Sequence, residues 1–215
     1  MENNDFDEEY NKRWNAYFYP NTNVFVNKMN ITDGDELYKY EREMVDNKLL
    51  ELHNNPIEGD FDIKHLCDIH KYLFGDLYEW AGKFRDVYMR KVNGSYFAPV
   101  DRIEEYLLDD IKVMKEELCH VYNLETLADF ITNAYVALLN THPFREGNGR
   151  AVREFLREYI VNKTRLLYDE SYDIDWNIVN HQLVSELIPF GRAYSTSIKM
   201  EILKALVPYN KIVKK

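Results

Sequence analysis

Residues 142–153 read HPFREGNGRAVR and place two of the chain's eight glycines within three positions of each other. These two, Gly147 and Gly149, flank Asn148 just before a helix that we expect to start near Arg150. Backbone N–H groups of such a turn point into one concavity at a helix N-terminus, where the helix dipole also favours an anion. The stretch therefore predicts a main-chain cradle for phosphate between two helices.

Four charged or titratable side chains accompany this turn. Arg150 and Arg153 are three residues apart, so they project from one helix face and can bind further phosphate oxygens. Glu146 supplies the kind of carboxylate that holds Mg²⁺ together with phosphate oxygens. His142, with an ordinary pKa of about 6.5, can accept a proton from a hydroxyl group. Together these residues predict a nucleotide-phosphate site with a general base, and leave open which phosphorus is attacked.

The charge balance argues against two classes of partner. The chain has 27 Lys and Arg against 37 Asp and Glu, a formal net charge of −10, which opposes broad binding to nucleic acid or to an anionic membrane. No apolar run reaches the roughly 18 residues of a membrane helix. The acidic start, through Glu9, also differs from the basic beginning of a signal peptide. We therefore expect a cytoplasmic protein with no nucleic-acid and no membrane partner.

Sparse glycine and proline favour a mostly helical domain. With eight glycines, six prolines and no linker of low complexity in 215 residues, the chain suits helices joined by short turns. Thr32 and Asp62 are expected to cap two of these helices, because their side-chain oxygens can accept a first-turn N–H. Apolar spacing predicts helices over about 33–53, from Asp62 to 73, 103–114, 124–139 and 150–160, and a final pair over 176–189 and 193–207.

The segment from Arg85 to Pro99 has a different pattern. Val87, Met89 and Val92 alternate before Asn93-Gly94, a pair favoured in tight type I′ turns, and a second short run follows. This pattern predicts a small β-hairpin in an otherwise all-α protein.

The stretch 142–153 resembles the signature HPFx(D/E)GNGRxxR of the Fic family at every fixed position. Further similarities follow in the family's order: Asn27-Lys28 with 31–33, the segment 65–85, and Phe97-Ala98-Pro99. The resemblance covers about residues 17–207. It implies an all-α Fic-type helical bundle with a β-hairpin flap over 17–207, between a flexible acidic N-terminal arm, 1–16, and a short basic tail, 208–215.

The resemblance implies a protein adenylyltransferase that moves AMP from ATP to a Ser, Thr or Tyr hydroxyl of a target protein and releases pyrophosphate. ATP and Mg²⁺ are the expected cofactors. The roles implied for the matching positions are general base for His142, magnesium ligand for Glu146, anion hole around the α- and β-phosphates for Gly147, Asn148 and Gly149, β-phosphate ligand for Arg150, and γ-phosphate ligand for Arg153.

The predicted hairpin matches the family's flap, which holds the target protein in extended form by backbone pairing. The flap residues expected to contact the protein substrate are Tyr88, Met89, Tyr96 and Phe97.

The family is often inhibited by a helix that carries (S/T)xxxE(G/N). This chain has two (S/T)xxxE matches, Thr32 to Glu36 and Ser197 to Glu201, but Leu37 and Ile202 stand where Gly or Asn is required. The sequence therefore predicts that any inhibitory helix comes from a separate small antitoxin-like protein.

Three other functions use the same residues. A Doc-like phosphotransferase usually has Lys where Gly149 stands, so Gly149 favours AMP transfer. Removal of AMP by the same site stays open. A non-catalytic nucleotide-binding module is the alternative from a different class, and the intact His142 with both arginines argues against it.

Other residues of chemical interest are expected to be structural. His65 and His70 lie about 140° apart around their predicted helix, so with Cys67 they do not form a zinc site. Cys67 and Cys119 are too few for a disulfide framework and are expected as two buried thiols. The remaining histidines show no pattern of partners and are expected at the surface or the core boundary: His53, His120 and His181.

Overall fold

The computed structural model describes residues 2–91, 94–167, 171–188 and 195–209 of the chain. Its described part is mainly helical, with one two-stranded antiparallel sheet. The elements in chain order are α1 (Glu2–Asn15), α2 (Gly34–Asn54), α3 (Ile63–Phe74), η1 (Val100–Arg102), α4 (Ile103–Glu117), η2 (Leu118–His120), α5 (Leu124–Thr141), α6 (Asn148–Leu167), β1 (Tyr172–Ile174), α7 (His181–Leu187), α8 (Ser195–Ala205) and β2 (Leu206–Pro208).

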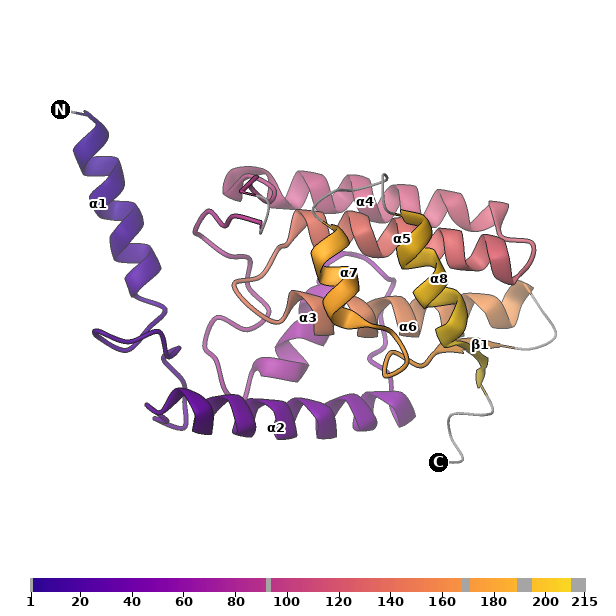
Figure 1. Cartoon of the computed structure of the whole chain (residues 1–215), viewed down its shortest axis with the longest axis horizontal. Helices are drawn as coiled ribbons and strands as arrows, with labels where there is room; N and C mark the ends of the chain where they lie inside the picture. Colours follow the sequence, from indigo (N-terminus) through magenta and orange to yellow (C-terminus); the bar gives the residue numbers. More distant parts are fainter. Residues whose placement is uncertain (1, 92–93, 168–170, 189–194, 210–215) are drawn as a thin grey trace.

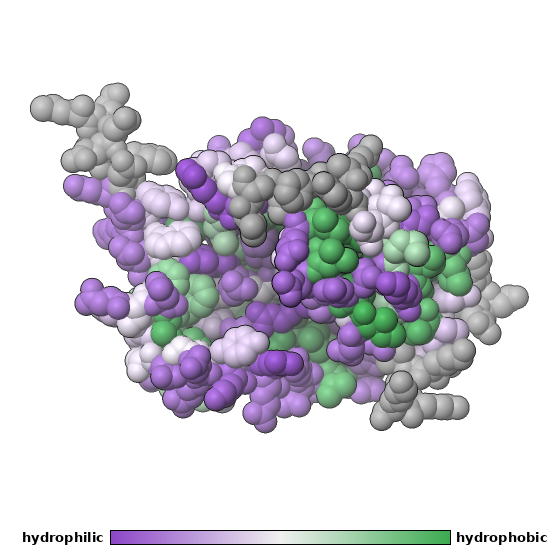
Figure 2. Space-filling view, in the orientation of Figure 1, coloured by the Kyte–Doolittle hydropathy of each residue, from purple (hydrophilic) through white to green (hydrophobic). Residues whose placement is uncertain are grey.

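The bundle is built around α5 and α6. Helix α5 packs against α4, α6 and α8, while α3 packs against both α6 and α2. Figure 1 shows α4, α5 and α6 side by side, α2 along the lower edge and α1 standing apart at the left. Figure 2 shows a mainly hydrophilic surface on this face, with hydrophobic residues gathered over α7 and α8. This arrangement confirms the mostly α-helical fold expected from the sequence.

Apolar periodicity explains why the central helices lie in the core. Leu127, Ile131 and Leu138 of α5 have at most 1% of their surface exposed, and Phe155 and Leu156 of α6 are fully buried. The α5 residues are four and seven positions apart, which places them on one helix face. Burial of such side chains against a second helix stabilises the bundle by about 1.5–3 kcal/mol for each large apolar residue. The link between α5 and α6, which holds the signature stretch, is therefore anchored at both ends.

Helix starts were predicted with mixed success. Asp62 caps α3 as predicted, since its carboxylate accepts the His65 N–H at 2.8 Å. The cap of α2 is Asp33 rather than Thr32, because the Asp33 carboxylate accepts the Glu36 N–H at 2.9 Å. Helix α6 begins at Asn148, two residues before the predicted start near Arg150.

In the described residues the predicted hairpin is reduced to one antiparallel bridge, Arg90 to Tyr96. Two backbone hydrogen bonds flank it, from Lys91 N to Ser95 O at 2.7 Å and from Phe97 N to Met89 O at 3.1 Å. Gly94 has the positive φ of 83° that the turn prediction requires, while Asn93 lies outside the described residues. We call residues 87–98 the flap below.

The regular sheet lies elsewhere and was not predicted. Strand β1 pairs with β2 with Tyr172 opposite Pro208 and Ile174 opposite Leu206. This pairing ends the last helix at Ala205, before the predicted end at 207. The other helix of the predicted final pair, 176–189, is shorter than expected and spans only His181–Leu187. Strands of three residues carry too little alternation to be recognised in a sequence.

Two further expectations differ from the structure. Residues Glu2–Asn15 form helix α1 where a flexible acidic arm was expected. Cys119, expected to be buried, is exposed, and its thiol donates to the Glu116 carbonyl at 3.1 Å. Most of the predicted basic tail, residues 210–215, lies outside the described residues. Within the described part of the chain, every helix is too short or too polar to cross a membrane.

Candidate active site

The signature stretch forms a tight loop between α5 and α6. His142 ends α5 in the left-handed conformation, with φ 52° and ψ 62°, and its N–H donates to the Leu138 carbonyl. Phe144 is fully buried and its ring stacks on His70 at 3.8 Å between centroids. The Asn148 side chain accepts the Phe144 N–H and donates to the Phe144 carbonyl, both at 2.8 Å. The Asn148 side-chain amide therefore closes the loop between residues 144 and 148.

Both glycines of the loop have a steric reason. Gly147 has φ 80°, and a Cβ at this position would lie 2.5 Å from the Phe74 ring. A Cβ at Gly149 would lie 3.2 Å from Nη1 of Arg153 and would crowd that guanidinium. Gly147 is therefore required by its positive φ and by the Phe74 ring, whereas a side chain at Gly149 would only require the Arg153 guanidinium to shift by a few tenths of an ångström.

The imidazole of His142 is prepared to accept a proton. Its Nδ1 lies 3.3 Å from the Leu139 carbonyl, so Nδ1 carries the hydrogen and Nε2 keeps its lone pair. The Phe97 ring stacks on the imidazole at 3.9 Å between centroids. Burial lowers the pKa of His142 to about 4, with nearby Arg85 and Lys91 adding to the effect. The ring is therefore neutral at pH 7.

Arg85 ties the flap to the loop that holds His142. Its guanidinium is buried, and it donates from Nε to the His142 carbonyl at 2.8 Å. Nη1 donates to the Val87 carbonyl at 2.8 Å and Nη2 to the Ala98 carbonyl at 2.6 Å. Both ends of the flap are therefore attached to His142 through one side chain. Burial lowers the pKa of Arg85 to about 10, which still leaves it charged at pH 7.

Glu146 and the two signature arginines line one cavity of about 630 Å³. The Glu146 side chain is half-exposed, and one of its oxygens accepts the Gly147 N–H at 2.9 Å. The His70 ring holds the backbone here, because its Nε2 lies 2.9 Å from the Glu146 carbonyl and its Nδ1 accepts the Gly82 N–H at 2.8 Å. Burial lowers the pKa of His70 to about 4.

Glu41 of α2 enters the same cavity and was missed in the sequence. Its Oε1 accepts a hydrogen bond from Nη1 of Arg150 at 2.6 Å, and its Oε2 accepts one from the Tyr78 hydroxyl. The Arg150 guanidinium also lies over the Phe74 ring, 4.6 Å from the centroid. One edge and one face of Arg150 are thus held in place. Glu41 is one of 37 acidic residues, 109 positions from Arg150, and no local pattern marks it.

Arg153 lines more than one cavity. It lines the 630 Å³ cavity with Arg150, and a second cavity of about 220 Å³ with His142 and Gly149. Its Nη1 donates to the Tyr135 hydroxyl at 3.3 Å, with no carboxylate paired to it among the described residues. His181 lines both cavities as well, and burial lowers its pKa. The structure thus places His181 beside a signature arginine, although its sequence context suggested no role.

The four predicted flap residues do not all face the same way. Phe97 covers His142, while Tyr88 and Tyr96 are 37% and 53% exposed. The Tyr96 hydroxyl accepts Nη2 of Arg90 at 2.6 Å. All four line another cavity, beside α1, which shares Phe97 with the His142 cavity: Tyr88, Met89, Tyr96 and Phe97.

The histidines considered for a metal are engaged in other contacts. His65 Nε2 lies 3.0 Å from Glu158, while His70 contacts the Glu146 backbone as described. The described residues contain no group of three or more His, Cys, Asp or Glu that could hold a metal ion.

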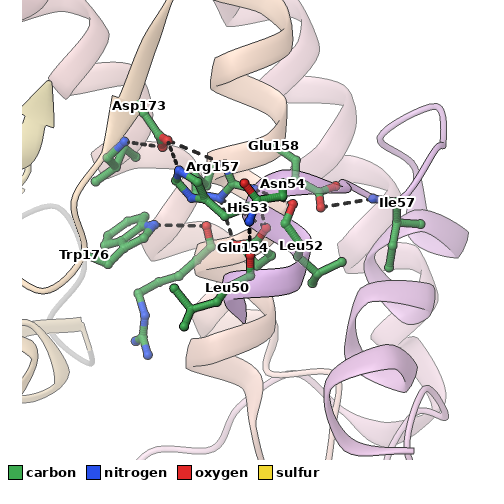
Figure 3. A network of polar contacts seen from close by, with 12 residues as sticks. Leu50, Leu52, His53, Asn54, Ile57, Glu154, Arg157, Glu158, Asp173 and Trp176 are labelled. Atoms are coloured by element: carbon green, nitrogen blue, oxygen red, sulfur yellow. Dashed lines mark hydrogen bonds and ion pairs between the residues drawn. The ribbon is translucent and has the colours of Figure 1, made fainter. Parts of the chain in front are cut away.

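A second polar network fastens α6 to α2 and β1 (Figure 3). Arg157 donates to Glu154 at 2.6 and 2.9 Å and to the Leu52 carbonyl at 3.3 Å, and it lies 3.6 Å from the buried Asp173. Burial raises the pKa of both Glu154 and Asp173. Trp176 donates to the Arg153 carbonyl at 3.2 Å, which fixes the backbone of α6 one turn from this network.

Comparison with known proteins agrees with this geometry. The model of the Fic/DOC family matches residues 60–160. The chain is 39% identical over 169 residues to the protein adenylyltransferase VbhT of Bartonella schoenbuchensis, covering 77% of this chain and 33% of VbhT. It is 34% identical over 153 residues to the probable protein adenylyltransferase y4lH of Sinorhizobium fredii, covering 68% of this chain and 76% of y4lH. The chain belongs to the Fic/DOC family.

A solved structure shares the fold. The BepC protein of Bartonella tribocorum, crystallised with bound AMPPNP, superimposes with a TM-score of 0.76 at 23% identity, over 90% of this chain and 97% of that one. The chain spans about a third of the length of VbhT and about three quarters of that of y4lH.

The buried histidines give a testable pH dependence. Because the pKa values of His142 and His70 are lowered to about 4 in the folded protein, the unfolded chain binds more protons between about pH 6.5 and pH 4. Stability is therefore fully present above about pH 6.5 and decreases as the pH falls through this window, by up to about 1.4 kcal/mol per pH unit for each proton. Histidine side-chain NMR should show both rings titrating near pH 4, and midpoints near 6.5 would contradict this.

Proposed function

We propose that this chain is a protein adenylyltransferase, which transfers AMP from ATP to a Ser, Thr or Tyr hydroxyl of another protein and releases pyrophosphate. The observation that carries the proposal is the neutral imidazole of His142, with Nε2 free to accept a proton, in the same cavity as Gly149 and Arg153. The names of the relatives, protein adenylyltransferase for VbhT and probable protein adenylyltransferase for y4lH, support it.

The proposed reaction needs one base and several phosphate ligands. The target hydroxyl attacks the α-phosphorus, its proton passes to Nε2 of His142, and the bond from the α-phosphorus to the bridging oxygen breaks to release pyrophosphate. The backbone N–H groups of residues 147–149, next to the start of α6, bind the α- and β-phosphates, and the Gly147 N–H exchanges the Glu146 carboxylate for phosphate in doing so. Arg150 binds the β-phosphate and Arg153 the γ-phosphate. Gly149, where Doc-like phosphotransferases usually have Lys, supports AMP transfer over phosphoryl transfer.

The residues present fit a magnesium ion that arrives with ATP. Mg²⁺ usually binds one or two carboxylates together with substrate phosphates and keeps several waters. Glu146 supplies one half-exposed carboxylate to the cavity, and the described residues hold no cluster of acids that would form a complete protein cage. When bound, the ion would neutralise charge on the phosphate oxygens. The role of Glu146 is to hold it.

The target protein docks on the flap in this proposal. The described residues of the flap form one backbone bridge, and the N–H and C=O of Arg90 lie outside its hydrogen bonds, so an extended segment could pair with them. Tyr88, Met89, Tyr96 and Phe97 are the side chains proposed to contact the target. Because Arg85 links both flap ends to the His142 carbonyl, a segment held by the flap lies at a set position relative to the base.

We also propose that the chain acts in the cytoplasm, where ATP is supplied, and that a separate small antitoxin-like protein inhibits it, as in a toxin–antitoxin pair. Glu36 and Glu201, the two acids in the (S/T)xxxE matches, support the proposal of a separate inhibitor. Glu201 is engaged on α8 and its loop, where it accepts the Asn180 N–H at 3.0 Å and pairs with Lys204 at 2.7 Å. Glu36 is exposed in the first turn of α2. No ion pair joins either acid to Arg153 in the described part of the chain.

A double-label experiment tests the transferred group. The protein is incubated with a cell lysate and ATP labelled separately at the α- and γ-phosphates, next to a His142→Ala control. Label from the α-phosphate alone is expected, reduced by about 10²–10⁴-fold in the control. Label from the γ-phosphate alone would indicate phosphorylation instead, and α-label that survives the substitution would eliminate His142 as the base.

The contact between Glu41 and Arg150 predicts a change in nucleotide use. Removing the carboxylate with Glu41→Ala frees one edge of the Arg150 guanidinium and leaves the buried Tyr78 hydroxyl without its acceptor. We expect KM for ATP to rise about tenfold, with a smaller change in kcat. Glu41→Gln should raise KM less, because its side-chain oxygen can still accept hydrogen bonds. An exposed acid of the same helix, Glu43→Ala, serves as the control. Tighter ATP use by Glu41→Ala would show that Glu41 competes with phosphate.

The inhibition proposal predicts that the isolated chain is active. Substituting Glu36→Ala or Glu201→Ala should leave the rate of α-label transfer unchanged, because neither carboxylate contacts a signature arginine. A large gain of activity in either variant, measured in the same labelling assay, would mean that inhibition is intramolecular.

A further inference from the structure

A groove separates α1 from the flap. It has a volume of about 890 Å³, and its lining is mostly aromatic: Tyr10, Trp14, Tyr88, Met89, Arg90, Tyr96, Phe97 and Pro99. Tyr10 and Trp14 form the α1 wall, and their rings stack at 6.2 Å between centroids. We call this the α1–flap groove.

Helix α1 is attached to the flap and to the signature loop. The Tyr10 hydroxyl donates to the Tyr88 carbonyl at 2.9 Å. Trp14 covers the Arg145 guanidinium, 4.3 Å from Cζ to the ring centroid, and Arg145 is 5% exposed. The α1 wall therefore has a defined place relative to the loop that carries His142 and Glu146.

The backbone of the flap offers a pairing edge on the side where α1 is attached. In the bridge between Arg90 and Tyr96, hydrogen bonds come from the neighbours of each residue, so the N–H and C=O of Arg90 itself point away from the partner strand. The Tyr88 carbonyl, two residues earlier, points the same way and already accepts the Tyr10 hydroxyl. An extended segment can therefore pair beside Arg90 while Tyr10 bounds it at one end.

The charges around the groove are positive although the whole chain is acidic. Arg90 lines the groove, with its guanidinium 4.7 Å from the Tyr96 ring centroid. Arg145, Arg90 and Arg85 are all close enough to act on the Tyr10 hydroxyl and oppose the rise that burial causes in its pKa. A carboxylate is thus the charge that complements this surface.

The groove continues into the cavity that holds His142. Arg90 and Phe97 line the groove and also line the 220 Å³ cavity shared by His142, Gly149 and Arg153. A segment that lies in the groove and passes Phe97 would bring its next residues beside His142, since Phe97 stacks on that imidazole.

We propose that the α1–flap groove binds the part of the target protein that flanks the modified hydroxyl, and that it selects an extended segment with an aromatic side chain next to a carboxylate. The aromatic side chain packs between the α1 wall and the flap, and the carboxylate lies toward Arg90. This inference rests on the proposed transfer to a protein. It adds that Tyr10 and Trp14, outside the region matched by the family model, determine which targets are accepted.

Peptide binding tests the groove without requiring catalysis. Three fluorescent 12-residue peptides, each with a central Thr, carry Tyr with Asp, Tyr with Lys, or Ala with Asp at the flanking positions, and their binding is measured by anisotropy. We expect the Tyr and Asp peptide to bind at least tenfold more tightly than the other two. Tyr10→Ala should weaken that binding about tenfold, and Tyr10→Phe less, because it keeps the ring and loses only the hydrogen bond to Tyr88.

Controls separate the groove from folding and from the nucleotide site. Lys12→Ala, an exposed residue of the same helix that does not line the groove, should bind all three peptides as the unsubstituted protein does. Affinity for ATP should be unchanged in Tyr10→Ala, because Tyr10 lines neither nucleotide cavity. Loss of ATP binding in that variant would indicate a general structural defect and would overturn the assignment of Tyr10 to target selection.

The outcomes distinguish this inference from the proposed function. Equal affinity for the three peptides, or unchanged binding by Tyr10→Ala, overturns the groove proposal even if α-label is transferred to proteins. Selective peptide binding without α-label transfer overturns the adenylyltransferase proposal and leaves the groove as a peptide-binding site. Self-association that Tyr10→Ala abolishes, measured by light scattering without peptide, would assign the groove to a second copy of the chain and overturn the proposal.

Discussion

The buried guanidinium of Arg85 is the interaction on which the arrangement of the site depends. It donates to the carbonyl groups of His142, Val87 and Ala98, and at 3.5 Å to that of Thr141. A guanidinium can do this because its N–H donors lie in one rigid plane and point in different directions. Loss of these bonds would leave the carbonyls at both ends of the flap unpaired and would free the flap from the loop that carries His142. The charge of Arg85 also helps to keep the pKa of His142 low, so one residue influences both position and protonation.

The two signature arginines are prepared differently although the sequence presents them alike. Arg150 is held by Glu41 and rests on Phe74, whereas among the described residues the Arg153 guanidinium hydrogen-bonds to a tyrosine hydroxyl alone. A charge-assisted hydrogen bond orients a guanidinium more strongly than a neutral one does. In the proposed reaction, Arg150 would therefore offer a fixed edge to phosphate, while Arg153 could move to meet the end of the triphosphate. The Glu146 carboxylate accepts the Gly147 N–H, and His70 holds the Glu146 backbone.

Features with a local cause were predicted well. The caps, the turn glycine Gly94 and the apolar stripes depend on residues a few positions apart, so their signals are present in any short window of the chain. Asp33 caps α2 where Thr32 was predicted. Both residues have a side-chain oxygen that can accept a first-turn N–H, so the pattern did not distinguish two helix starts one residue apart. The β1–β2 sheet was missed because its strands are only three residues long and pair across more than 30 positions of sequence. Helix α1 was missed because its acidic sequence has a weak apolar face.

The sequence by itself determined the family, the loop glycines and the identity of the candidate base, carboxylate and arginines. These residues lie within twelve consecutive positions, so one loop and the start of one helix hold them close together. Only the tertiary structure decided the protonation of His142, the pairing of Arg150 with Glu41, and the groove that α1 forms with the flap. Each of these depends on burial or on contact between residues distant in the chain. The burial that shifts a pKa and the distances between helices arise only when the bundle packs. They therefore cannot be predicted from a pattern of neighbouring residues.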